Sequence, residues 1–331
     1  MKVCVTGGAG MIGSSLVKKL CESGYEVQVI DNLWRGSKSY LEQINGWSLD
    51  LNFHHIDLAD PGSLSRVTKI FSSCEVVIHL ADIVAGIGYV FNHQYEIFKV
   101  NNHINSLVFE ACAASRIRKV VYAGTACSFP KQLQNGLTSI LREDQLFPAE
   151  PESSYGWSKL AGTLELNYLC MNSEMEGVTL MLHNVYGINC DLSPKRSQVI
   201  PSLIRRMLEL RDGESLTVWG SGRQGRAFVY VDDIVNAFLK AIEKDNLPQI
   251  IQIGPDTCTS IRDLAYLLKD EVLCKQIDIF FDETKPEGDA GRCADYSLAK
   301  NVLGWSPGVD LKTGLAQTTN WIAQALKSAE V

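Results

Sequence analysis

Two side chains four positions apart could carry acid–base chemistry in this 331-residue chain. Tyr155 and Lys159 form a Tyr-x-x-x-Lys pair, which lies on one face of a helix with the two residues one turn apart. A lysine cation beside a phenol favours the phenolate and should lower the pKa of Tyr155 towards neutrality. Tyr155 could then exchange a proton with a substrate hydroxyl, and Thr125 supplies a second hydroxyl at the end of a predicted strand. Taken alone, the pair would equally suit an exposed helix without a catalytic role.

A glycine-rich turn near the start of the chain is the second chemical feature. An apolar run at residues 2–6 leads into the turn, and a helical pattern resumes at Met11 and Ile12. The turn holds three glycines at G-x-x-G-x-x-G spacing, which are Gly7, Gly10 and Gly13. Such a turn lets the backbone approach a pyrophosphate, while the helix N-terminus supplies N–H donors. We therefore predict a dinucleotide cofactor here.

An acidic residue at the end of the second predicted strand indicates which dinucleotide binds. Asp31 follows the strand at residues 25–30 and stands eighteen positions after Gly13. A carboxylate there accepts hydrogen bonds from ribose hydroxyls and repels a 2′-phosphate. The sequence thus predicts NAD rather than NADP, and Arg35 is the residue that would favour NADP.

The amino-acid composition and the net charge disfavour some classes of binding partner. Hydrophobic residues make up 46% of the chain and charged residues 21%, as in an ordinary globular protein. The net charge of −7 does not favour a nucleic acid or an anionic membrane as partner. No apolar run approaches the roughly 20 residues that cross a bilayer, and no basic-then-apolar leader precedes the first strand, so we expect a cytoplasmic protein.

The ten cysteines are scattered, without a C-x-x-C pair or a nearby histidine cluster. We therefore expect reduced, mostly buried thiols, with neither a disulfide framework nor a zinc site. No other metal-ligand set is evident.

Strands alternate with helices through the first half of the chain, which predicts an α/β fold with a Rossmann-type, doubly wound parallel sheet. Strands are expected at residues 2–6, 25–30, 52–56, 76–80, 119–123 and 178–183, and helices at 63–72, 94–115 and 156–173. Asp57 and Leu58 follow the third strand, where they could contact an adenine, although a plain loop aspartate is an alternative. Leu80 and Ala81 end the fourth strand and leave room for phosphates or ribose.

After Gly187 the pattern changes to a polar loop followed by shorter helices and strands. We expect an NAD-binding domain at residues 1–184 and a smaller mixed α/β substrate lobe at residues 185–331. Segments such as 227–254 should return to the first domain. Asp232 and Asp233 are expected as N-cap acids of a helix.

Together these motifs resemble the extended short-chain dehydrogenase/reductase family, the NAD-dependent nucleotide-sugar epimerases and dehydratases. The resemblance implies that Tyr155 is the acid/base, that Lys159 holds the nicotinamide ribose, and that Thr125 binds the sugar oxygen. It also implies bound NAD that oxidises the sugar, commonly at C4. Cofactor contacts are assigned to Gly7, Gly10, Met11, Ile12, Gly13, Asp31, Asn32, Arg35, Asp57, Leu58, Leu80, Ala81, Asn101, Tyr155 and Lys159. Substrate contacts are assigned to Gly86, Asn184, Gln198, Arg226 and Arg292.

Within this family the chain is most similar to the group of GDP-mannose 3,5-epimerases. The similar segments are Gly124–Pro130, Pro148–Pro151, His183–Asn184 and Glu287–Arg292. Oxidation at C4 makes the C3 and C5 hydrogens acidic, so Cys127 could be the base that removes one, or it could be a small buried residue. Gln198 stands where the group carries an acid lysine, with Lys195 three positions away, and Met181 replaces an arginine.

The resemblance favours a GDP-sugar, then a UDP-sugar, as substrate, and implies a homodimer formed through the helices at residues 94–115 and 156–173. A 4,6-dehydratase would carry Asp-Glu where this chain has Ala126-Cys127. A simple 4-epimerase is the second hypothesis, because it needs only Tyr155, Lys159 and Thr125. A binding protein without turnover is disfavoured, since such proteins usually lose the tyrosine or the lysine.

Overall fold

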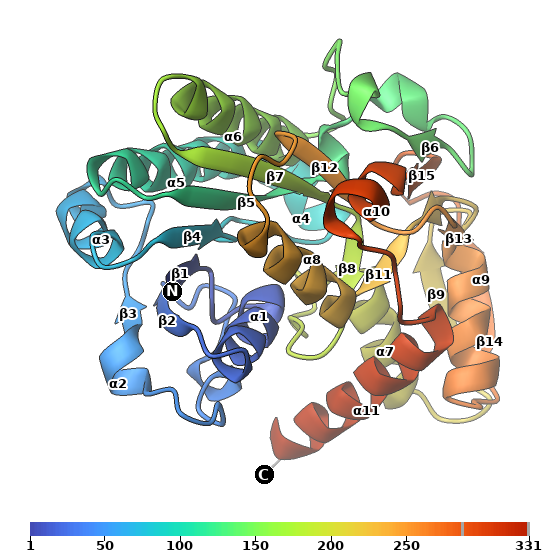
Figure 1. Cartoon of the computed structure of the whole chain (residues 1–331). Helices are drawn as coiled ribbons and strands as arrows, with labels where there is room; N and C mark the ends of the chain where they lie inside the picture. The colour runs from blue at the N-terminus through green and yellow to red at the C-terminus, as the bar shows by residue number, and fades with distance from the viewer. Residues whose placement is uncertain (286–287, 330–331) are drawn as a thin grey trace.

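A seven-stranded parallel sheet forms the centre of the protein (Figure 1). The computed structural model describes residues 1–285 and 288–329. Across the sheet the strands are β12 (Ile250–Ile253), β7 (Glu176–Leu182), β5 (Lys119–Thr125), β4 (Val76–His79), β1 (Lys2–Thr6), β2 (Glu26–Asp31) and β3 (Phe53–His55). All neighbouring pairs are parallel. The chain order reverses between β1 and β4, as in a doubly wound sheet, which confirms the predicted fold class.

Helices cover both faces of the sheet, because successive side chains of a strand point to opposite sides. Val3 and Val5 of β1 belong to a core with α1 and α8, whereas Cys4 belongs to a core with α3, α5 and α6. The helices of these cores are α1 (Met11–Glu22), α8 (Val231–Glu243), α3 (Leu64–Phe71), α5 (Gln94–Ala114) and α6 (Ser154–Met171). Burial on both faces explains why the strands are apolar without alternation.

Three smaller sheets build the second lobe (Figure 1). They are the sheet of β13 (Thr259–Ser260), β10 (Gly225–Arg226), β15 (Gly291–Ala294) and β6 (Ile140–Leu141), the pair of β8 (Asn184–Tyr186) and β11 (Phe228–Tyr230), and the pair of β9 (Ser215–Trp219) and β14 (Asp278–Asp282).

The other α-helices of the protein are α2 (Leu49–Asn52), α4 (Ile87–Asn92), α7 (Val199–Glu209), α9 (Ile261–Tyr266), α10 (Ser297–Leu303) and α11 (Leu311–Ala329). In the described part of the chain no helix has the length and apolar character needed to cross a membrane.

One strand from each half of the sequence belongs to a sheet of the other lobe. β6 lies in the first half of the sequence but pairs with β15 in the small sheet. β12 lies in the second half but forms the edge of the large sheet beside β7. No single position therefore divides the two lobes.

One disulfide contradicts the expectation of reduced thiols. Cys258 and Cys293 are bonded, with their Cα atoms 5.6 Å apart and a sequence separation of 35 residues. Both flank β10, because β13 and β15 pair with that strand on either side. A Cβ at Gly225 of β10 would lie 2.3 Å from the Leu137 carbonyl oxygen and 3.2 Å from Cys258 Cβ, so this position beside the bridge needs a glycine. The pairing depends on this sheet order, which sequence spacing alone does not show.

The two acids at the start of α8 do not cap the helix, contrary to our expectation. The N-cap residue is Tyr230, and Asp232 and Asp233 lie within the first turn. The buried Asp233 carboxylate instead accepts hydrogen bonds from the N–H groups of Gly308 (3.0 Å) and Val309 (3.1 Å). Asp233 thereby fixes the segment before α11 onto α8.

We expect Asp233→Ala to destabilise the protein by about 1–3 kcal/mol, because it leaves two backbone N–H groups without their acceptor. Urea unfolding measures the change. The matched control is Asp232→Ala, which removes the neighbouring exposed carboxylate. Equal stability of the two variants would contradict the role given to Asp233.

Candidate active site

A cavity of about 1380 Å³ opens where β1, β4 and β5 end. Of the residues assigned from the sequence, those that line it are Gly7, Gly10, Met11, Ile12, Gly13, Asp31, Asn32, Arg35, Asp57, Leu58, Leu80, Ala81, Gly86, Thr125, Cys127, Tyr155, Lys159, Asn184, Gln198, Arg226 and Arg292. Residues from both lobes therefore face one space.

The β1–α1 turn leaves no room for side chains where it meets β4. Gly7 has a φ of +71°, and a Cβ added there would lie 2.8 Å from the Ala81 backbone nitrogen. A Cβ at Gly13 would lie 2.2 Å from the Gly7 carbonyl oxygen. α1 begins at Met11, and Gly10 before it brings no side-chain cap to the first amides. This cradle fits the diphosphate of a dinucleotide, which the amides and the helix dipole would bind.

Asp31 and Arg35, at and just after the end of β2, make different hydrogen bonds. The Asp31 carboxylate accepts hydrogen bonds from the N–H groups of Ala9 (2.9 Å) and Leu33 (2.7 Å). Burial raises the pKa of Asp31, and these two donors counteract the rise. Each oxygen retains a lone pair that can accept from a ribose hydroxyl. The Arg35 guanidinium donates to the Val84 carbonyl oxygen at 2.7 Å, which weakens the one sequence argument for NADP.

A second pair joins the ends of β2 and β3. Asn32 Nδ2 donates to Asp57 Oδ1 at 3.3 Å, and Leu58 beside it is buried. The three residues form one continuous part of the cavity wall.

Asn101 is the assigned cofactor residue that the structure does not place in the cavity lining. Its side chain is 1% exposed, and its Oδ1 accepts from the Ile83 N–H at 2.7 Å. Its Nδ2 donates to Ser158 Oγ at 3.3 Å. Asn101 therefore joins the segment after β4 to α6.

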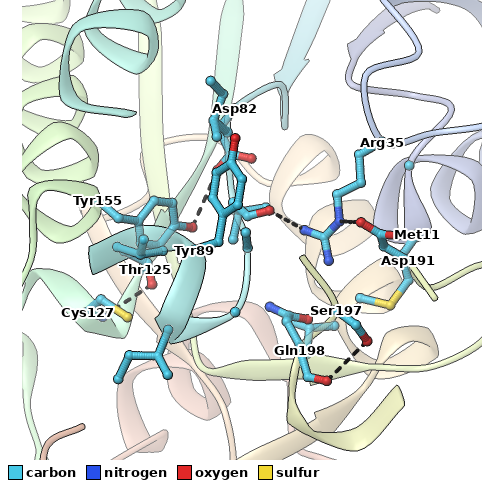
Figure 2. A pocket seen from close by; sticks show the side chains of 18 of the residues that line it. Met11, Arg35, Asp82, Tyr89, Thr125, Cys127, Tyr155, Asp191, Ser197 and Gln198 are labelled. Atoms are coloured by element: carbon cyan, nitrogen blue, oxygen red, sulfur yellow. Dashed lines mark hydrogen bonds and ion pairs between the residues drawn. The ribbon is translucent and has the colours of Figure 1, made fainter. Parts of the chain in front are cut away.

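Asp82 lies between the two residues of the Tyr-x-x-x-Lys pair. Its Oδ2 is 2.8 Å from Lys159 Nζ and accepts a hydrogen bond from the Tyr155 hydroxyl at 3.4 Å (Figure 2). Lys159 is 1% exposed and also donates to the Ala123 carbonyl oxygen at 2.8 Å. Thr125 ends the same strand as Ala123, so the hydroxyl and the acid–base groups share one wall of the cavity.

The pKa of Tyr155 moves in the direction opposite to the sequence-based expectation. Burial raises it well above the usual value, the charge of Asp82 raises it further, and the hydrogen bond with Thr125 counteracts part of the rise. Burial lowers the pKa of Lys159, but Asp82 and Tyr122 outweigh burial and raise it. Lys159 is thus a cation paired with Asp82, and Tyr155 carries its proton.

Cys127 lies in the 3-10 turn Ala126–Ser128, directly after β5. Thr125 Oγ1 accepts a hydrogen bond from the Cys127 N–H at 3.2 Å. In Figure 2, Cys127, Thr125 and Tyr155 lie on one side of the cavity, and Arg35 with Asp191 lies on the other. The thiol therefore opens onto the same space as the Tyr155 hydroxyl.

Two buried arginines face Cys127 from neighbouring strands of the small sheet. Burial lowers the pKa of Arg292, but the interactions with Cys127 and then Asp289 outweigh burial and raise it. Burial and the charge of Arg292 lower the pKa of Arg226 to about 10. Arg226 Nη1 donates to the Asp289 carbonyl oxygen at 2.8 Å, and Arg292 Nη1 donates to Gln134 Oε1 at 3.1 Å.

Three loops from both lobes join across the cavity. The Asp191 carboxylate pairs with Arg35 Nε (3.4 Å) and Arg196 Nε (3.2 Å). Arg35 also holds Val84, and the Gly86 N–H donates to the Arg196 carbonyl oxygen at 2.9 Å. We call these five residues the latch. The segment of the latch after β4 ends where α4 begins at Ile87.

A match to a family model decides to which protein family the chain belongs. The family described as "NAD dependent epimerase/dehydratase family" matches residues 3–254, which is more than half of the chain. The chain belongs to this family. The resemblance inferred from the motifs and the assignment of NAD as cofactor are thereby confirmed.

Three known proteins show what this family member is similar to. GDP-mannose 3,5-epimerase 1 of Oryza sativa subsp. indica is 27% identical over 337 residues, covering 99% of this chain and 83% of that protein. A putative UDP-glucose 4-epimerase of Methanocaldococcus jannaschii is 32% identical over 326 residues, covering 97% and 98% of the two chains. The solved structure of a UDP-glucose 4-epimerase with UDP-glucose from Thermotoga maritima has a TM-score of 0.85, 29% identity, and coverage of 98% of this chain and 100% of that one.

Sequence reasoning missed three residues of this epimerase/dehydratase site. Asp82 follows Leu80 and Ala81 at a strand end, and that position is the signal that could have revealed it. Asp191 and Glu152 lie in polar segments where no spacing points to them. Burial and then Asp289 raise the pKa of Glu152 to about 7. Glu287, part of a motif quoted above, lies outside the described residues.

We expect Asp191→Ala to release NAD on the order of tenfold faster, because it removes the carboxylate on which two arginines of the latch converge. Stopped-flow cofactor exchange and the NAD content of the purified protein measure the effect. Glu209→Ala is the matched control, since it removes the exposed ion pair with Arg205 on α7. Unchanged release in Asp191→Ala would show that the latch does not retain NAD.

Proposed function

We propose that this family member is an epimerase that transiently oxidises a nucleotide-diphosphate hexose at C4. The observation that supports the proposal most strongly is that Tyr155, Thr125 and Cys127 share one cavity wall. In this proposal residues 1–184, together with α8 and β12, hold NAD. The remainder of residues 185–331 binds the nucleotide and sugar.

The hydroxyls of Tyr155 and Thr125 act on the C4 oxygen of the sugar. Thr125 orients that oxygen by a hydrogen bond, and Tyr155 exchanges a proton with it. NAD, when bound, accepts the hydrogen of C4 with its electron pair and later returns it. Lys159 uses two donors for Asp82 and Ala123, which leaves its third for the nicotinamide ribose.

Cys127 acts at the carbon next to C4. Once C4 is a ketone, the hydrogens on C3 and C5 are acidic, and a thiolate can remove one of them. Inversion needs a second group that returns a proton from the other side. Glu152 is our candidate for this second group, because it lines the same cavity and its pKa of about 7 lets it hold and release a proton near neutral pH. Lys195 and Gln198 also line the cavity, and Met181 is buried away from it.

The arginine pair is the proposed site of the diphosphate. Arg226 and Arg292 both line the cavity, and Arg292 Nε has no hydrogen-bond partner among the described residues. Guanidinium groups bind phosphate oxygens in a bidentate manner, and Gly86, Asn184 and Gln198 line the adjoining wall. We favour a GDP-sugar, because the shared motifs are those of GDP-mannose 3,5-epimerases, and a UDP-sugar next.

A simple 4-epimerase is the second candidate function. It is favoured by the 32% identity with a putative UDP-glucose 4-epimerase and by the TM-score of 0.85 with a solved one. That reaction would use Tyr155, Lys159 and Thr125 and would leave Cys127 without a role.

Deuterium uptake separates the two functions. In D₂O with a panel of GDP-, UDP-, CDP- and dTDP-sugars, we expect the protein to place deuterium on C3 or C5, as read by NMR. We expect Cys127→Ala to lower this uptake by about 10²–10⁴-fold while the protein still oxidises C4. The matched control is Cys21→Ala, because Cys21 is also partly buried but lies in α1. Inversion at C4 without deuterium would identify a 4-epimerase, and no reaction with any sugar would contradict both functions.

We also propose a homodimer formed through α5 and α6. Large apolar side chains are exposed on both helices, with Tyr95 at 79% and Phe98 at 42% on α5, and Tyr168 at 64% and Met171 at 72% on α6. The two pairs have i, i+3 spacing, so each forms a stripe on its helix. Each stripe, one at the start of α5 and one at the end of α6, is an exposed apolar patch of the kind typical of protein interfaces.

We expect the double substitution Tyr168→Lys and Met171→Lys to convert the dimer to a monomer, because charges would face each other across the apolar patch. Sedimentation equilibrium measures the mass. Leu51→Lys, at a residue 75% exposed on α2, should leave the mass unchanged. A monomeric unmodified protein would refute the dimer.

A further inference from the structure

The carboxylate of Asp82 is the charged group closest to the acid–base residues. It follows β4 in the cavity wall with its side chain 10% exposed, 2.8 Å from Lys159 Nζ. The same oxygen accepts the hydrogen bond of the Tyr155 hydroxyl.

We propose that Asp82 is the proton partner of Tyr155, keeping Tyr155 as a hydroxyl at rest and accepting its proton when the substrate alcohol is deprotonated. The proposal rests on the proposed oxidation at C4 and names how its proton is carried. Asp82 acts through Tyr155, so it is a positioning and relay residue.

Asp82 is the charged group that acts most strongly on Tyr155. The other ionisable groups that act on the pKa of Tyr155 are Cys127 in the turn after β5 and Tyr122 on β5, while Lys159 on α6 is paired with Asp82. Burial raises the pKa of Tyr122, so that phenol is neutral. His79 on β4 faces Lys159, and burial followed by that cation lowers its pKa to about 3, so it is neutral too.

The charge of Asp82 offsets the charge of Lys159 where the two meet. A lysine alone would stabilise the phenolate, as the sequence led us to expect. With the carboxylate at the same place, Tyr155 gains a hydrogen-bond acceptor and loses that stabilisation. Asp82 can therefore accept the Tyr155 proton inside the site, and no phenolate is needed at the start of the reaction.

The proton movement balances in each direction. The C4 hydroxyl proton passes to the Tyr155 oxygen while the Tyr155 proton passes to Asp82 Oδ2. The C4–H bond breaks, its electron pair leaves with the hydrogen to NAD, which is reduced, and a C4=O bond forms. Asp82 is then a carboxylic acid, and the return of the hydrogen to C4 reverses both transfers. The Tyr155–Asp82 bond of 3.4 Å is long, as such bonds often are before substrate binds.

The first test follows tyrosinate formation by ultraviolet difference absorbance in the NAD-loaded protein. Tyr155→Phe is also made in the unmodified protein and in each variant. Subtracting its titration leaves the absorbance change that comes from Tyr155 alone. We expect Asp82→Asn to lower the pKa of Tyr155 by about 1–3 units, and Asp82→Glu, which keeps the carboxylate, to restore it. Glu96→Gln makes the same chemical change at an exposed residue in the cavity lining and should have no effect. An unchanged Tyr155 pKa in Asp82→Asn would overturn the proposal.

The second test measures single-turnover reduction of bound NAD by GDP-mannose or UDP-glucose as a function of pH. With Asp82 present, the rate should not fall as the pH is lowered through the Tyr155 pKa that the first test finds for the unmodified protein, because Asp82 accepts the tyrosine proton. In Asp82→Asn it should fall tenfold per pH unit below the Tyr155 pKa found in the first test. A flat profile in Asp82→Asn would overturn the relay. If neither sugar reduces NAD, oxidation of these sugars fails, while the first test still decides whether Asp82 holds the Tyr155 proton.

Discussion

The buried ammonium group of Lys159 is the constraint around which the active site is arranged. An ammonium group removed from water needs close partners, because desolvation disfavours its charge. Its partners come from two strand ends, Asp82 after β4 and the Ala123 carbonyl in β5. Because β4 and β5 are parallel neighbours, both ends reach the same edge of the sheet. α6 can bring Lys159 to that edge because Gly162 lets it approach closely, since a Cβ there would lie 2.6 Å from the Tyr122 hydroxyl.

Charges also join the two lobes around the cavity. Asp191 comes from the loop after β8, and Arg35 comes from the loop after β2, so their ion pair crosses from one lobe to the other. Their side chains are largely buried, with 7% and 19% exposed, so solvent screens the pair less than a surface pair. An enclosed cofactor suits transient oxidation, because the hydrogen removed from a sugar must return to the same sugar. The ion pairs of the latch therefore suit the proposed chemistry, which requires the cofactor to stay enclosed between the lobes.

The parts of the structure that local patterns determine were predictable. Strand–helix alternation predicted the doubly wound sheet, and the glycine spacing predicted the turn between β1 and α1, because both depend on neighbours in sequence. The Tyr-x-x-x-Lys pair predicted two residues of the cavity lining for the same reason. Asp82, Asp191 and the Cys258–Cys293 bridge depend on which strand ends and loops meet in space. The hydrogen bond from the Ile83 N–H to Asn101 likewise depends on a loop that meets α5 in space, which the motif does not show.

The cavity places its two reactive side chains beside different charged groups. Tyr155 meets Asp82 after β4, whereas Cys127 interacts with Arg292 of β15 in the small sheet. In the proposed reaction the C4 oxygen and the neighbouring carbon lose protons at different times. A shared carrier would couple the two steps, because a proton left by the first would block the second. With separate carriers, the proposed oxidation can be reversed at C4 whether or not the carbon beside it has been inverted.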